Sequence, residues 1–227
     1  MTDPTHKREP KYLLQRAEQF ILPRLASRLP AWVTPDHLTS LGLLSCLLIG
    51  LCYALSGQYK WLLLLTVPLW LLNWLGDSLD GTLARIRRIQ RPFYGYYLDH
   101  MVDMLSAAAV CIGIGLSPYV NMGFAITLLL LYYLLSINVF LETLVLRKFQ
   151  YGYGFIGPTE VRILLSGLAI FIYFRSEPTI HLLDFKIGIG DIAAASAALF
   201  MIISLVYRII SNLDYLGKID PPNVVKH

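Results

Sequence analysis

Charged residues are scarce in this sequence. Only 15% of its 227 residues are Asp, Glu, Lys or Arg, whereas 56% are hydrophobic. Soluble domains carry roughly 25% charged residues, and disordered chains are polar and rich in charge. The composition therefore excludes a water-soluble globule and a disordered chain, and it predicts an integral membrane protein.

Cysteine is also scarce, with three residues in the chain. Cys46, Cys52 and Cys111 all fall in apolar segments, and their spacing is typical of neither a zinc site nor a disulfide framework. We interpret them as small apolar side chains.

Long apolar runs are abundant, and small polar breaks divide them. No Asp, Glu, Lys or Arg occurs from Met104 to Leu141. That run is too long for one crossing of a ~30 Å hydrocarbon core, and the break at Ser117-Pro118 divides it in two. The whole pattern predicts an all-α fold with six transmembrane helices, at about 38–56, 61–89, 94–116, 119–147, 159–175 and 187–211.

Basic residues are distributed unevenly around these six helices. One side holds 16 of the 19 Lys and Arg residues, within residues 1–37, 85–95, 147–162 and 207–227. Because basic loops stay in the cytoplasm, both termini are predicted to be cytoplasmic. The net charge of +4 then belongs to a rim that faces anionic lipid, and nucleic acid is not an expected partner.

The chain before the first span mixes apolar and basic side chains. Residues 11–29 place Phe20 and Ile21 among Arg16, Arg24 and Arg28, which predicts an interfacial amphipathic helix. The alternative is a solvated arm. The predicted organisation is a cytoplasmic N-terminal segment with this helix at 1–37, a six-helix catalytic domain at 38–213 and a cytoplasmic tail at 214–227.

Four acidic residues interrupt the apolar background in two neighbouring helices. Asp77 and Asp80 lie on one face of the second predicted span, and Asp99 and Asp103 lie one turn apart on the third. Four acids near the membrane need counter-charge, because a buried charge there is costly. Oxygen ligands suit Mg²⁺, Mn²⁺ or Ca²⁺, so we expect two divalent cations and phosphoryl chemistry.

Small residues accompany the acids on the same helical stripes. Gly81, Ala84 and Gly95 leave room beside the carboxylates. Such residues often allow close packing of membrane helices, which is the alternative interpretation. Together with the acids, they favour a bound ligand that carries phosphate.

The combined pattern resembles a known family signature. D-x-x-D-G-x-x-A-R followed by G-x-x-x-D-x-x-x-D is similar to the signature of the CDP-alcohol phosphotransferases, membrane enzymes that make phospholipids. The matching residues are Asp77, Asp80, Gly81, Ala84, Arg85, Gly95, Asp99 and Asp103.

The resemblance implies roles for individual positions. The four acids would bind two Mg²⁺ or Mn²⁺ ions around the diphosphate of a CDP-linked donor, and Asp103 would also act as the catalytic base. Homodimers are common in the family. Residues implied in nucleotide binding are Thr39, Asp77, Gly81, Ala84, Arg85 and Gly95.

The acceptor is less constrained by the sequence. Glu160 and Arg162 open the fifth predicted span on the active-site side, where they are either ordinary helix-start residues or ligands of the acceptor. The resemblance favours CDP-diacylglycerol as donor and a polar alcohol as acceptor. One alternative is the transfer of choline or ethanolamine phosphate from its CDP derivative to diacylglycerol. A divalent cation transporter is the alternative from another class, although the acids gather at only one end of the helices.

Overall fold

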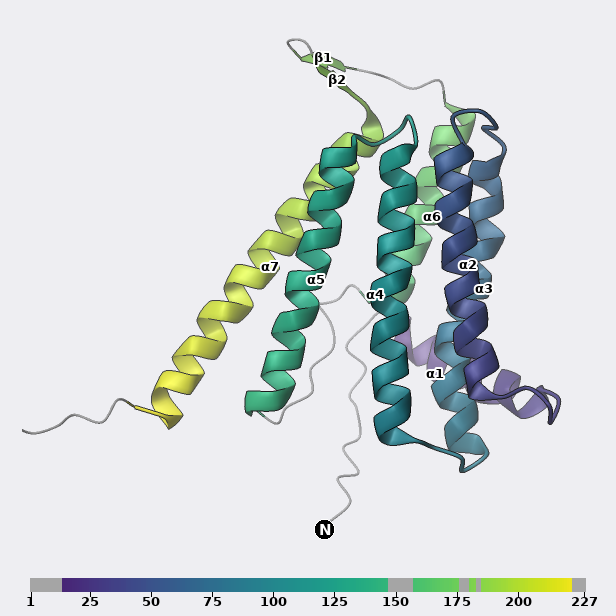
Figure 1. The fold of residues 1–227 in the computed structure, drawn as a ribbon, viewed down its shortest axis with the longest axis vertical. Helices are drawn as coiled ribbons and strands as arrows, with labels where there is room; N and C mark the ends of the chain where they lie inside the picture. Colours follow the sequence, from purple (N-terminus) through teal and green to yellow (C-terminus); the bar gives the residue numbers. More distant parts are fainter. Residues whose placement is uncertain (1–13, 147–156, 176–179, 183–184, 222–227) are drawn as a thin grey trace, which may run out of the picture.

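The protein is seen here in a computed structural model, which describes residues 14–146, 157–175, 180–182 and 185–221. Seven helices dominate this part of the chain, and a short hairpin precedes the last of them (Figure 1). The helices are α1 (Gln15–Arg28), α2 (Pro35–Leu55), α3 (Leu62–Ile86), α4 (Pro92–Leu116), α5 (Met122–Leu146), α6 (Pro158–Phe174) and α7 (Ile189–Ile219). The all-α prediction is thereby confirmed apart from the hairpin.

The predicted spans agree closely with the helices α2 to α7. Their ends differ by at most three residues, except that α7 continues to Ile219, eight residues past the predicted end. The hairpin pairs β1 (Ile180–Leu182) with β2 (Phe185–Ile187) in antiparallel register, and it was not predicted.

Five helices are long and apolar enough to cross a membrane: α2, α3, α4, α5 and α7. These helices indicate a multi-pass membrane protein. Helix α6 is the shortest of the six predicted spans, with 17 residues, and is not among the five. Five of the six predicted spans are thus candidate membrane spans by length and composition, and a sixth crossing stays a prediction.

The start of α2 is fixed by local hydrogen bonds. The hydroxyl of Thr34 accepts a bond from the backbone N–H of His37, and the Thr34 N–H donates to Nδ1 of His37, both at 3.3 Å. Pro35 occupies the first turn, where its missing N–H costs nothing. This cap sets where α2 begins, one turn before Thr39.

Glycine contacts bring α2 very close to both of its neighbours. A Cβ at Gly76 of α3 would lie 2.6 Å from the carbonyl oxygen of Leu38 on α2. A Cβ at Gly113 of α4 would lie 2.1 Å from the carbonyl oxygen of Gly50, also on α2. Only glycine permits such approaches. Helices α3 and α4 are thus both held against α2, and the acids that they carry come near one another.

Helix α1 packs across the end of α3. Leu22 and Ala26 are buried in a cluster with Leu79 and Leu83 of α3. Phe20 is 62% exposed on the other side of α1. A helix therefore lies within the predicted segment, with one apolar face on the protein and aromatic surface facing outward, and its position at a membrane interface stays a prediction.

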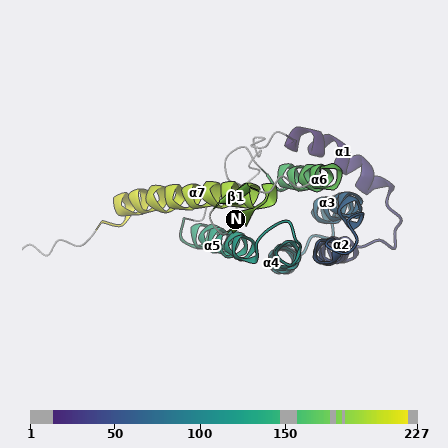
Figure 2. The ribbon, with the colours of Figure 1, turned by 90° about the horizontal axis from the view of Figure 1, so that it is seen from above.

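The remaining helices form two further pairs. Helix α6 packs on α3, whereas α7 packs on α5, which in turn contacts α4 (Figure 2). Glu142 of α5 is buried and forms an ion pair with Arg208 of α7. Asn212 donates a further bond of 2.6 Å to Glu142, so polar contacts join α5 to α7 within their apolar lengths.

Candidate functional site

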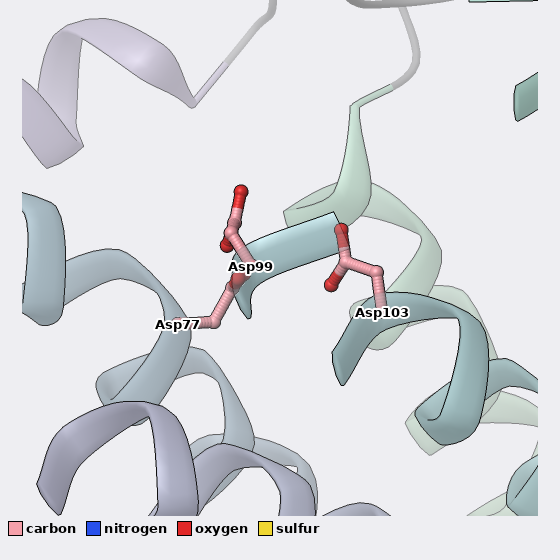
Figure 3. A group of neighbouring side chains, drawn as sticks. All are labelled: Asp77, Asp99 and Asp103. Carbon is pink, nitrogen blue, oxygen red and sulfur yellow. The ribbon is translucent and has the colours of Figure 1, made fainter. Parts of the chain in front are cut away.

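Three of the four predicted acids converge. Asp77 from α3 and Asp99 and Asp103 from α4 each offer a carboxylate oxygen, and these oxygens lie within 4.8 Å of one another (Figure 3). The spacing of four residues places Asp99 and Asp103 on the same face of α4. Within the described residues, this is a group of carboxylates with the separation that a metal ion needs.

Asp80 lines the same pocket but has other partners. Its Oδ2 accepts a hydrogen bond of 2.7 Å from the hydroxyl of Thr39 on α2. Its Oδ1 accepts a bond of 2.5 Å from the backbone N–H of Gly81. Asp80 is therefore adjacent to the cluster of three acids but is not a member of it in this arrangement.

The pocket lies between α2, α3 and α4. Carboxylates and hydroxyls dominate its polar surface, which suits a hard cation and the oxygen atoms of a phosphate. The lining residues are Thr39, Gly42, Asn73, Asp77, Asp80, Asp99, Val102, Asp103 and Ser106.

Arg162 of α6 contacts two of the residues that line this pocket. Its Nη2 donates a hydrogen bond of 2.5 Å to Oδ2 of Asp77, and its Nε donates one of 2.8 Å to Oδ1 of Asn73. The Arg162 side chain is only 13% exposed, and that of Asp77 is 29% exposed. The guanidinium thus supplies a counter-charge to the acids.

Asn73 is a site residue that the sequence analysis missed. It is buried, and its Nδ2 donates a bond of 3.1 Å to the carbonyl oxygen of Gly42. This bond orients Oδ1 toward Arg162. An amide four residues before Asp77 in an otherwise apolar helix was the available signal.

The small residues of the signature lie outside the lining of this pocket. A Cβ added to Gly95 would meet nothing within 4 Å, and one added to Gly81 would lie 3.4 Å from Nη1 of Arg85. Nη2 of Arg85 donates a bond of 3.0 Å to the hydroxyl of Thr82. Ala84 is half-buried on the same helix. The open space beside Gly95 agrees with a ligand larger than an ion, and nucleotide binding there stays a prediction.

Glu160 has a structural role in this arrangement. Its Oε2 accepts a bond of 3.0 Å from the N–H of Gly157, which caps α6, and its Oε1 accepts one of 3.1 Å from the N–H of Leu14. It does not line the described pocket. Its predicted contact with the acceptor stays a prediction, whereas Arg162 does reach the acids.

Comparison with known proteins supplies one clear match. A sequence model of the family described as CDP-alcohol phosphatidyltransferase matches residues 32–210, which include α2 to α6 and most of α7. A search of curated proteins found no significant match.

Proposed function

Because the chain belongs to the CDP-alcohol phosphatidyltransferase family, whose members transfer substituted phosphate groups in phospholipid synthesis, we propose that it transfers such a group from CDP-diacylglycerol to a polar alcohol. The observation that carries this proposal is the convergence of Asp77, Asp99 and Asp103 in one pocket. A family match alone would leave the site unplaced, whereas the cluster supplies carboxylates that would hold the divalent cations required by the diphosphate of the donor.

The acids would hold divalent cations of the Mg²⁺ or Mn²⁺ type. Asp77, Asp99 and Asp103 present oxygens at a suitable separation, and Asp80 lies beside them in the same pocket. When bound, such ions neutralise the charge of the diphosphate and of the departing phosphate. We propose two ions shared among the four carboxylates.

The proposed reaction is a substitution at phosphorus. The hydroxyl oxygen of the acceptor forms a bond to the phosphorus that carries the diacylglycerol, and the bond from that phosphorus to the bridging oxygen of CMP breaks. The hydroxyl proton passes to the carboxylate of Asp103, and CMP leaves with the electron pair of the broken bond. Asp103 is proposed as this base because it lies with Asp77 and Asp99 on the pocket surface.

The nucleotide is proposed to occupy the open side of α3 and α4. Gly81, Ala84, Arg85 and Gly95 would contact it, and the free volume next to Gly95 supports this assignment. Thr39 would also contact the nucleotide, next to Asp80, to which its hydroxyl donates a hydrogen bond.

The acceptor is proposed to approach from the side of α6. Arg162 is the cation that contacts the acids on that side, and its planar guanidinium can bind a phosphate or carboxylate on the alcohol.

We further propose that α6 completes six crossings, that α1 lies at the interface, and that the termini and the active site face the cytoplasm. Homodimer formation remains a proposal from the family resemblance.

A single product screen tests this function. Purified protein, Mn²⁺ and CDP-diacylglycerol are incubated separately with serine, inositol, inositol phosphate, glycerol phosphate, ethanolamine and choline. A parallel arm offers CDP-choline or CDP-ethanolamine with diacylglycerol. We expect CMP and a new phospholipid in one CDP-diacylglycerol reaction.

Matched aspartate variants make the screen specific to the pocket. Asp77→Asn should lose CMP release, whereas Asp214→Asn, on the exposed surface of α7, should retain it. Product in the parallel arm alone would reverse donor and acceptor. Uptake of Mn²⁺ into liposomes with no CMP release in any arm would contradict the enzyme and favour a transporter.

A further inference from the structure

Arg162 contacts a carboxylate oxygen of Asp77, one of the residues proposed to bind a metal ion. Its Nη2 lies 2.5 Å from Oδ2 of Asp77, a carboxylate that also belongs to the cluster of three acids. A second bond, from Nε to Asn73, holds the guanidinium in place. The contact is therefore a fixed two-point interaction that involves one of the candidate metal ligands.

Glu18 of α1 stabilises the position of the two helices that form this contact. Oε1 of Glu18 on α1 accepts a bond of 2.5 Å from the hydroxyl of Thr159 and one of 2.9 Å from Nε1 of Trp74. Thr159 lies one turn before Arg162 on α6, and Trp74 lies one turn before Asp77 on α3. Glu18 thus joins α6 and α3 next to the Arg162–Asp77 pair. The two side chains then lose less conformational entropy when they form their contact.

Two cations that share one carboxylate oppose each other. The pair is largely shielded from water, so the repulsion between a guanidinium and a divalent ion is weakly screened. A metal ion can use Asp77 fully only after its bond to Arg162 weakens. The free energy of the Arg162–Asp77 contact is therefore subtracted from the free energy of metal binding.

We propose that Arg162 is the resident counter-ion of Asp77 and lowers the affinity of the pocket for divalent cations, with Glu18 as the positioning residue that holds it there. This inference rests on the proposed function, because it takes the cluster of acids as the metal site. It couples two events: the binding of a divalent ion favours the release of Arg162 from Asp77, and that release favours the binding of the ion. The released guanidinium keeps Asn73 as a partner and gains the freedom to bind an anion.

The test measures Mn²⁺ binding by electron paramagnetic resonance on the full-length protein in detergent, without donor or acceptor. Arg162→Gln removes the charge and keeps a hydrogen-bonding side chain, so Mn²⁺ should bind at least about fivefold more tightly. Arg162→Lys keeps the charge and should bind Mn²⁺ about as the unmodified protein does. Arg175→Gln removes a charge at the opposite end of the same helix and serves as the matched control, with no change expected.

Glu18 provides a second route if Arg162→Gln does not yield a folded protein. Glu18→Ala removes the acceptor shared by Thr159 and Trp74, so it should also tighten Mn²⁺ binding, by a smaller factor. Glu18→Gln keeps an acceptor oxygen and should restore the original affinity. Rescue by this conservative variant separates positioning from a general loss of stability.

The outcomes distinguish this inference from the proposed function. Saturable Mn²⁺ binding that is equal in Arg162→Gln and the unmodified protein would overturn the counter-ion role and leave the enzyme proposal intact. A lack of Mn²⁺ binding in the unmodified protein and in every variant would contradict the metal site itself. Equal tightening by Arg162→Lys and Arg162→Gln would overturn the electrostatic explanation.

Discussion

Individual carboxylates in the pocket have different surroundings, which gives them different proposed tasks. Asp77 is paired with Arg162, and Asp80 accepts bonds from Thr39 and from the N–H of Gly81. Asp99 and Asp103 complete the cluster from α4. Asp77 already forms an ion pair with Arg162, and an acid bound by a cation is a poor proton acceptor. Asp103 is proposed as the base through a carboxylate oxygen that the metal ions would leave free.

Replacement of Asp103 tests this assignment. Asp103→Asn keeps the shape of the side chain and removes its ability to take a proton. We expect CMP release to fall at least about 100-fold, since general-base catalysis contributes roughly 10²–10⁴. Binding of CDP-diacylglycerol, measured by equilibrium dialysis, should be largely retained. Normal turnover in this variant would remove Asp103 from the mechanism.

Gly95 tests the proposed nucleotide position. Because a Cβ at this position meets nothing within 4 Å, Gly95→Ala should leave the unfolding temperature unchanged or slightly higher. If the nucleotide lies against this bare backbone, the same methyl group should raise KM for the donor severalfold. An unchanged KM together with an unchanged melting temperature would place the nucleotide elsewhere.

At the scale of helices, the site depends on how closely α2 approaches its neighbours. Gly50 on α2 faces Gly113 on α4, and the N-terminal half of α2 faces Gly76 on α3. The acids of α3 and α4 come together because both helices pack against α2. Membrane helices gain little from hydrophobic burial against each other, so such close backbone packing is a main source of their stability.

A pair of glycine substitutions measures the contribution of this packing. Gly113→Ala would place a methyl group 2.1 Å from the carbonyl oxygen of Gly50, so α2 and α4 must separate. We expect a destabilisation of about 1–3 kcal/mol and a loss of Mn²⁺ binding as the acids move apart. Gly167→Ala in α6, where nothing lies within 4 Å, is the control and should not destabilise the protein in thermal unfolding. Equal stability of the two variants would contradict the packing argument.

At the scale of the whole molecule, the number of crossings decides where the termini lie. Five helices satisfy the length and apolarity of a span, and α6 has 17 residues, or about 26 Å at 1.5 Å per residue. That length is slightly short of a ~30 Å core. The concentration of basic residues on one side of a six-helix arrangement still favours a crossing by α6.

Tags at the two ends of the chain test the topology. With six crossings, both tags should be protected from external protease in intact cells and cleaved in inverted vesicles. With five crossings, one tag would be cut in each preparation, and α6 would not cross. A tag inserted between Ser56 and Lys60, in the loop between α2 and α3, is the matched control and should show the opposite accessibility.

The sequence by itself determined the helices, the breaks between them and the identity of the acids. These depend on local patterns, namely apolar runs of membrane length, the polar breaks between them and the spacing of the signature. The tertiary structure decided which groups meet. Arg162 is 85 residues from Asp77, and Thr39 is 41 residues from Asp80, so no local pattern specifies either contact.

The same distinction applies to Glu160, for which the sequence left a helix-start role and an acceptor contact open, and to Asn73, which the sequence analysis did not single out. Glu160 caps its own helix and binds the N–H of Leu14, and Asn73 positions Arg162, because the packing of α1 and α6 on α3 brings these groups together. Hydrophobicity and capping act over a few residues and can be read along the chain. The partner of a buried charge is set by the close approach of whole helices, which only the assembled fold determines.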